Sequence, residues 1–119
     1  MLQDIDHIQL AMPKGEEPAA RAFYGSLLGM KEIAKPENLQ ARGGVWFTLG
    51  DRQVHLGIES DFHAAKKAHP AFLVDDLDTL RTTLSTAGYP IIDDEPLPGH
   101  KRFYSRDPFG NRLEFLKRL

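Results

Sequence analysis

The sequence contains no cysteine among its 119 residues, which excludes a disulfide framework and a thiolate metal site. It has no apolar stretch as long as a membrane span, and its first residues lack the basic and apolar regions of a signal peptide. The 15 basic and 17 acidic residues form no long run of one sign, which argues against a nucleic acid or an anionic membrane as partner. We therefore expect one cytoplasmic domain, residues 1–119, of ordinary globular composition.

Two successive parts of the chain show the same order of expected elements. In module 1, about 1–60, apolar alternation and periodicity predict a strand at 5–12, a helix at 16–28 and strands at 30–34, 45–49 and 52–59, with a loop at 35–44. In module 2, about 67–119, they predict a strand at 69–74, a helix at 76–87 and strands at 90–94, 101–106 and 112–117. The order βαβββ occurs twice, which predicts an α+β fold with an internal repeat.

Four polar residues interrupt apolar strand segments at matching places in the two modules: His7 and His69 in the first strands, His55 and Glu114 in the last. Strand alternation places each of them on the face opposite the apolar residues. Imidazole nitrogens and a carboxylate oxygen suit a divalent metal such as zinc, iron, nickel, cobalt or manganese. Any one of them alone is more often a hydrogen-bonded or exposed residue. Their equivalence between the modules favours one shared site.

The chain resembles the vicinal oxygen chelate superfamily, which comprises glyoxalases, bleomycin resistance proteins and extradiol dioxygenases. The resemblance covers essentially the whole chain and is carried by four segments: Asp-His-Ile-Gln-Leu (6–10), Ala-Phe-Tyr-Gly-Ser-Leu-Leu-Gly-Met (22–30), His-Pro-Ala-Phe-Leu-Val-Asp-Asp-Leu (69–77) and Phe-Tyr-Ser-Arg-Asp-Pro-Phe-Gly-Asn-Arg-Leu-Glu-Phe (103–115). It implies two βαβββ modules whose mixed sheets curl around a central cup. It also implies a homodimer, often with sites shared between subunits.

Carried over position by position, the resemblance implies metal ligation by His7, His55, His69 and Glu114. Relatives of the glyoxalase and epimerase types often have a carboxylate or glutamine where this chain has His55. His55 is therefore either a ligand or an acid–base group, and Glu114 is the other candidate for proton transfer. The expected substrate-binding residues share faces with these four or lie on a neighbouring strand: Gln9, Trp46, Arg102 and Tyr104. Of these, Arg102 and Tyr104 suit an anionic substrate group.

These expectations together favour a metalloenzyme, either a glyoxalase-like lyase or isomerase or a dioxygenase-like enzyme. Its small oxygenated substrate would chelate the metal through two adjacent oxygens, and an enolate or oxyanion would be stabilised. The alternative is a non-catalytic protein that binds a drug or antibiotic, as in bleomycin resistance. Addition of a thiol or water to an epoxide antibiotic is a third possibility. It requires a phosphonate-binding cluster that this sequence matches incompletely.

Overall fold

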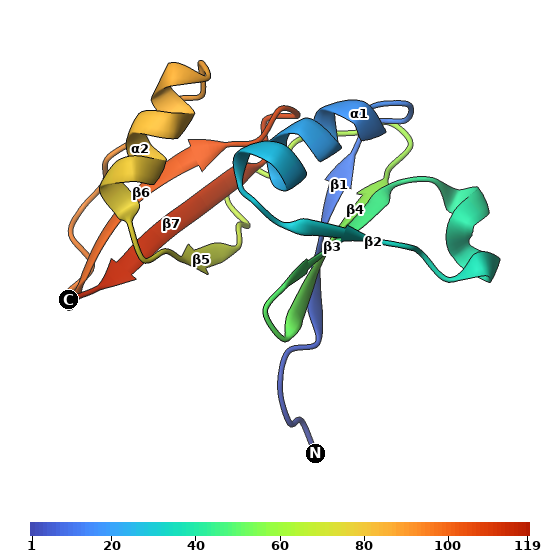
Figure 1. Ribbon diagram of the computed structural model, residues 1–119, viewed down its shortest axis with the longest axis horizontal. Helices are drawn as coiled ribbons and strands as arrows, with labels where there is room; N and C mark the ends of the chain where they lie inside the picture. The colour runs from blue at the N-terminus through green and yellow to red at the C-terminus, as the bar shows by residue number, and fades with distance from the viewer. The chain divides into compact units, whose positions relative to one another are not determined.

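The computed structural model describes residues 1–119 as two compact units, Met1–Ala64 and Ala65–Leu119. Each unit has its own small mixed sheet, of four strands in the first and three in the second (Figure 1). The α+β class that the sequence predicts is thereby confirmed, whereas the predicted order βαβββ is complete only in the first unit. None of the helices has the length and hydropathy that crossing a bilayer requires.

The first unit contains four strands and three short helical segments. They are β1 (His7–Met12), α1 (Glu17–Ala20), the π-helical η1 (Arg21–Leu27), β2 (Lys31–Ile33), the 3₁₀ segment η2 (Glu37–Arg42), β3 (Val45–Leu49) and β4 (Arg52–Ile58). The strand order is β1-β4-β3-β2, with β1 parallel to β4 and the other neighbours antiparallel (Figure 1). The predicted helix at 16–28 is thus half π-helical, and the predicted loop at 35–44 contains η2.

One face of the first sheet forms the core of that unit. Its buried residues come from alternate positions of three strands and from the helical segment η1, where the Tyr24 ring lies 6.0 Å from that of Phe47. Alternation therefore turns the other face, with His7, Gln9 and His55, away from this core. The residues with the least exposure on the core face are Met12, Val45, Phe47, Val54 and Leu56, covered by Phe23 and Tyr24.

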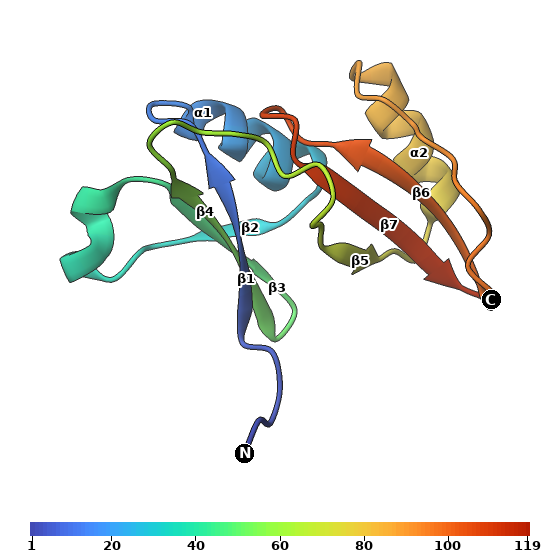
Figure 2. The same ribbon diagram turned by 180° about the vertical axis from the view of Figure 1, so that it is seen from behind.

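The second unit contains β5 (Ala71–Leu73), α2 (Leu77–Thr86), β6 (His100–Arg106) and β7 (Arg112–Arg118). Its strand order is β5-β7-β6, with β5 parallel and β6 antiparallel to β7. Helix α2 lies along one face of this sheet (Figure 2). It begins after Asp76, which is its N-cap, because the Asp76 carboxylate accepts a hydrogen bond from the Thr79 amide at 3.0 Å.

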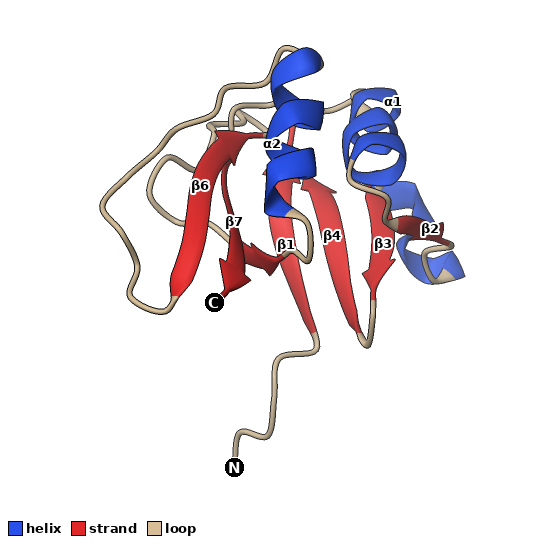
Figure 3. Ribbon diagram, turned by 60° about the vertical axis from the view of Figure 1, so that its left-hand side comes forward, coloured by secondary structure: helices blue, strands red, loops and turns tan.

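Two strand predictions in the second unit need correction. The strand predicted at 90–94 is only an isolated bridge between Ile92 and Tyr104, and the connection from α2 to β6 is drawn as a loop in Figure 3. The strand predicted at 69–74 is shortened to β5 (Figure 2). Pro90 and Pro70 lack the amide that a ladder needs. The Pro70 carbonyl still accepts a hydrogen bond from the Glu114 amide at 3.0 Å, so His69 lies just before the strand.

The turn between β6 and β7 is closed by buried side chains. The Asp107 carboxylate accepts hydrogen bonds from the amides of Phe109 and Asn111, both at 2.9 Å, and from the Asn111 side chain at 3.0 Å. The Asn111 side chain in turn accepts from the Ala65 amide at 3.0 Å. Gly110 has a φ of 91°, which glycine adopts without a steric penalty. The Asp-Pro-Phe-Gly-Asn segment therefore fixes the register that places Glu114 beside Tyr104.

Candidate functional site

Three aromatic side chains form a continuous stack on the open face of the first sheet. The His55 imidazole lies between the Trp46 indole, with ring centroids 3.7 Å apart and an interplanar angle of 2°, and the His7 imidazole, 4.2 Å away. Register places the three rings on one face, because His55 is the Cα partner of Trp46 on β3, while His7 on β1 is the partner of Gln53, two residues before His55 on β4. The structure thus brings together three of the residues that the sequence proposes for the site.

The ring of His55 is buried and held in one orientation. Only 4% of the residue is exposed, and its Nε2 lies 2.8 Å from the Gln53 side-chain oxygen. Burial lowers the pKa of His55, the neighbouring His7 lowers it further, and Asp6 acts in the opposite direction. The imidazole is therefore held in its neutral form, which is the form that binds metals or accepts a proton.

His7 is more open, with a side chain 43% exposed. Its Nδ1 lies 2.9 Å from an Asp6 carboxylate oxygen, so Nε2 is the ring nitrogen left for a ligand. Gln9 lies over Gly57, where a Cβ atom would come within 2.6 Å of the Gln9 amide nitrogen. Gly57 therefore makes room for Gln9 on the same face as His55.

Lys35, which the sequence analysis did not propose as a site residue, also belongs to this face. Lys35 follows β2 at the same parity as Ile33, the partner of Trp46. Its ammonium donates a hydrogen bond to the Gly43 carbonyl, and its charge contributes to the lowered pKa of His55. Strand parity counted from Trp46 would have identified it.

In the second unit, His69 and Glu114 form a close pair. His69 Nε2 lies 2.9 Å from Glu114 Oε1, and its Nδ1 lies 2.8 Å from the Lys67 carbonyl oxygen. Both ring nitrogens therefore face acceptors. A neutral imidazole has one N–H and satisfies only one of them. The pair is suited either to an imidazolium or to a cation held between Nε2 and the carboxylate.

The second Glu114 oxygen contacts Arg102, which also bonds Tyr104, the other residue expected to bind substrate on this strand. Arg102 Nη1 donates to Glu114 Oε2 at 3.3 Å and to the Tyr104 hydroxyl at 2.9 Å. Burial favours the neutral acid, but the hydrogen bonds from His69 and Arg102 together outweigh it and lower the pKa of Glu114. Glu114 is thus an ionised carboxylate of which 6% is exposed.

Arg112 shares a strand face with Glu114 by alternation, and in the structure it contacts the Tyr104 ring. Its guanidinium carbon lies 4.0 Å from the centroid of the Tyr104 ring. His69 approaches the same ring edge-on, with centroids 5.2 Å apart. Tyr104 is therefore the centre of a cluster that contains His69, Arg102, Arg112 and Glu114.

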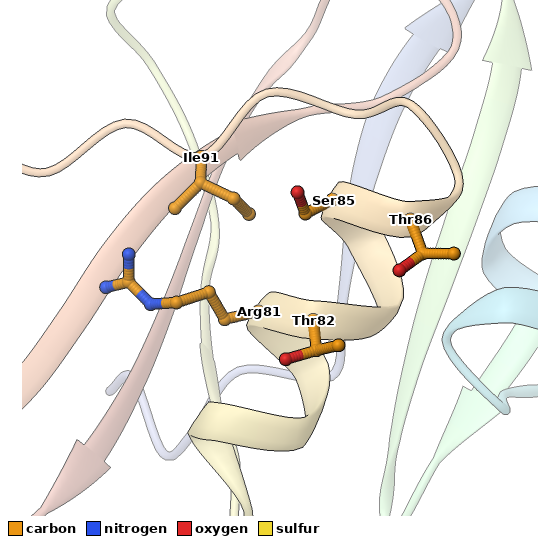
Figure 4. Close-up of a pocket in the computed structure, with 5 residues that line it drawn as sticks. All are labelled: Arg81, Thr82, Ser85, Thr86 and Ile91. Atoms are coloured by element: carbon orange, nitrogen blue, oxygen red, sulfur yellow. The ribbon is translucent and has the colours of Figure 1, made fainter.

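An open hollow of about 380 Å³ lies elsewhere in the second unit, against α2 (Figure 4). It is lined by Arg81, Thr82, Ser85, Thr86 and Ile91, and contains none of the residues proposed from sequence. Taken singly, neither unit gathers three or more His, Asp or Glu side chains in a metal-binding group. The candidate ligands form one pair per unit: His7 with His55, and His69 with Glu114.

Comparison with known proteins identifies similar chains over almost the full length. The family model of the Glyoxalase/Bleomycin resistance protein/Dioxygenase superfamily matches residues 4–115. A solved structure described as a glyoxalase family protein from Bacillus anthracis is 50% identical, with a TM-score of 0.95, covering 100% of this chain and 98% of that one. No protein of curated function matches the chain.

More distant structures share the fold alone. A glyoxalase/dioxygenase from Nostoc punctiforme is 20% identical with a TM-score of 0.81, covering 98% of this chain and 92% of that one. A lactoylglutathione lyase from Agrobacterium tumefaciens is 23% identical with a TM-score of 0.75, covering 98% and 95%. Similarity at this level of identity shows that the chain shares the fold and does not show which reaction it catalyses.

Proposed function

Because the chain belongs to the glyoxalase/bleomycin resistance protein/dioxygenase superfamily, we propose that it is a metalloenzyme acting on a small oxygenated substrate. The superfamily generally uses divalent metals. The observation that carries the proposal is the arrangement of His69 and Glu114, in which an imidazole nitrogen and an ionised carboxylate face each other inside a half-buried cluster. Imidazole nitrogen and carboxylate oxygen are ligand types that divalent cations such as zinc bind in proteins.

The remaining hydrogen bonds of the histidines support this assignment. Metal-binding histidines usually donate their second ring nitrogen to a carboxylate or a backbone carbonyl. His69 faces the Lys67 carbonyl in this way and His7 faces the Asp6 carboxylate. Both residues therefore direct Nε2 toward a ligand. His55 differs, since its Nε2 is taken by Gln53 and only Nδ1 remains.

We assign His7, His69 and Glu114 as the metal ligands, with His55 as a fourth ligand or as the acid–base group. A bound divalent ion would supply Lewis-acid stabilisation of negative charge on a substrate that offers two adjacent oxygens. The neutral His55 ring has the lone pair needed to take a proton from that substrate. Arg102 and Tyr104 supply hydrogen-bond donors beside Glu114, and Trp46 and Gln9 orient the bound molecule.

Elemental analysis of protein purified without chelator tests the proposal. We expect a stoichiometric transition metal, lost in His7→Ala and Glu114→Ala and kept in His63→Ala, because the His63 ring is exposed and bonded only to the Asp61 carbonyl. His55→Gln separates the two roles of His55, since retention of metal with loss of turnover assigns it to proton transfer. A correctly folded protein that takes up no zinc, iron, nickel, cobalt or manganese under any loading would sink the enzyme proposal.

The second candidate is a non-catalytic protein that binds a drug or antibiotic. The stack of Trp46, His55 and His7 favours it, because an aromatic ligand could extend the stack at one of its outer rings. Quenching of the Trp46 fluorescence by bleomycin in metal-free protein, with no turnover of thiol adducts of methylglyoxal or of catechols by the loaded protein, would favour this candidate.

We also propose a cytoplasmic homodimer, as is typical of the superfamily. Sedimentation equilibrium of the purified chain tests the assembly. A mass near that of one 13.4 kDa chain at all concentrations would exclude a stable dimer.

A further inference from the structure

Arg112 has a fixed position and few partners. Its guanidinium stacks on the Tyr104 ring at 4.0 Å, and its side chain is only 21% exposed. The one carboxylate near it is that of Asp94, with Oδ2 3.9 Å from Nη2, beyond hydrogen-bond distance. A guanidinium carries five N–H donors in a planar fork. Those of Arg112 are held in place by the stacking and have no protein acceptor.

A second arginine stands directly across from it. Arg106 on β6 is the Cα partner of Arg112 on β7, and like charges opposite each other destabilise a sheet. The Arg106 guanidinium donates only to the Gly110 carbonyl, at 3.3 Å, and has no carboxylate partner. By contrast, Arg102 on the same face is paired with Glu114. Arg106 and Arg112 therefore differ from Arg102 in having no carboxylate within hydrogen-bond distance of the guanidinium.

Arg81, in the same unit, differs from Arg112 because its guanidinium is hydrogen-bonded to a carboxylate. It also lies over an aromatic ring, that of Phe103 at 5.0 Å. Its Nη2 and Nη1 atoms, however, donate to the two Asp93 carboxylate oxygens at 2.8 and 3.4 Å. The hollow beside α2 in Figure 4 therefore contains a guanidinium that is already neutralised. Arg81 therefore offers an anion no unpaired positive charge in this hollow.

We propose that Arg112 and Arg106 form a binding subsite for an oxyanion group, a carboxylate or a phosphate. Their Cα atoms are paired across the sheet, and neither guanidinium has a carboxylate within hydrogen-bond distance, so an oxyanion could accept charge-assisted hydrogen bonds from them. Arg112 and Glu114 share one strand face two residues apart, a separation of about 7 Å. The anionic group and the oxygens near Glu114 therefore fit on one small molecule. This last step rests on the proposed function, and it makes the substrate a small organic acid or phosphate ester.

Titration of the metal-free full-length chain with inorganic phosphate, and separately with acetate, tests the subsite. Binding is followed by the NMR resonances of the arginine Nε–H groups. We expect the Arg112 resonance to move, and Arg112→Ala to weaken binding about 10-fold or more, since charge-assisted bonds are lost. Arg112→Lys keeps the charge without the fork and is expected to weaken binding less. The tighter of the two probes identifies the class of oxyanion.

Further variants test the subsite even if Arg112→Ala perturbs the fold. Asp94→Asn removes the competing carboxylate and is expected to tighten binding several-fold, whereas Asp93→Asn changes the net charge equally and should not. Arg81→Lys should leave binding unchanged. The inference is overturned if Arg112→Ala or Arg112→Lys binds as the unaltered protein does, if Asp93→Asn and Asp94→Asn act alike, or if Arg81→Lys causes the loss.

The same variants separate this inference from the proposed function. Phosphate or acetate binding by Arg112 is measured without metal, and metal uptake is measured without either anion. Loss of anion binding in Arg112→Ala with normal metal uptake supports the subsite. Anion binding in a chain that takes up no metal retains the subsite and removes the enzyme proposal.

Discussion

His69 Nε2 lies 2.9 Å from Oε1 of Glu114, while Nδ1 of the same ring faces the Lys67 carbonyl at 2.8 Å. A carboxylate of which 6% is exposed thus depends on an imidazole for one of its two stabilising contacts. The other comes from Arg102. Removing either contact leaves the desolvation of Glu114 less compensated.

We expect His69→Ala to raise the pKa of Glu114 in metal-free protein, because burial then acts against fewer hydrogen bonds. In the unaltered protein the lowered pKa of Glu114 stabilises the folded state at pH values above the ordinary carboxyl pKa of about 4.3. This stabilisation is lost as the pH falls through the pKa that Glu114 has in the folded state. The variant should lose this contribution. Carbon NMR of the glutamate carboxyls against pH measures the shift. His63→Ala serves as the control, and an unmoved Glu114 resonance in His69→Ala would contradict the account.

Trp46→Ala is expected to raise the pKa of His55 toward its ordinary value of about 6.5, because burial is the largest cause of the lowering. A folded histidine with a lowered pKa binds fewer protons than the unfolded chain, so stability falls as pH drops below about 6.5 toward the folded pKa. Removing Trp46 should flatten that part of the profile. Proton NMR titration of the histidine rings measures it.

Two further variants test why the pKa of His55 is lowered. Trp46→Phe keeps a stacked ring and should leave the pKa of His55 nearly as low. His7→Ala removes the neighbouring charge, the second cause of the lowering, and should raise that pKa. Equal titration of His55 in the unaltered protein and in Trp46→Ala would refute the role of stacking in its burial.

Two glycines near this stack should respond differently to alanine. At Gly44, with φ +82°, a Cβ would lie 2.2 Å from the Leu56 carbonyl oxygen. Gly44→Ala should therefore cost about 1–3 kcal/mol from backbone strain, and more from the clash. At Gly57 the Cβ meets only the flexible end of Gln9. Gly57→Ala should displace Gln9 with little loss of stability. Urea unfolding and the Gln9 amide resonances distinguish the two, and equal stabilities would be unexpected.

Asp107→Ala should destabilise the second unit by about 3 kcal/mol, because it leaves buried donors of Phe109 and Asn111 without an acceptor. Asp51→Ala, in the exposed turn between β3 and β4, is the control and should change stability by no more than about 0.5 kcal/mol. Urea unfolding of both variants gives the comparison. A cost for Asp107→Ala as small as that of the control would show that the turn does not depend on its carboxylate.

Local sequence determined much of this protein. Alternating apolar residues set which strand face enters each core, so the pattern alone is enough to place His7 and His55 on the face opposite the core. Pro18, Gly29 and Gly88 mark the helix boundaries to within a few residues. The strands expected at 69–74 and 90–94 are exceptions, because alternation does not show where a proline or a missing neighbour ends the ladder.

Only the tertiary structure decided the partners of the site residues. Stacking of His55 between Trp46 and His7, the contact of His69 with Glu114, and the position of Arg112 over Tyr104 depend on register between strands. Register is set by the Gly50-Asp51 and Asp107–Asn111 turns and by the parallel pairs of β1 with β4 and β5 with β7. Sequence separation does not reveal such pairing, because a shift of one residue turns every side chain to the opposite face.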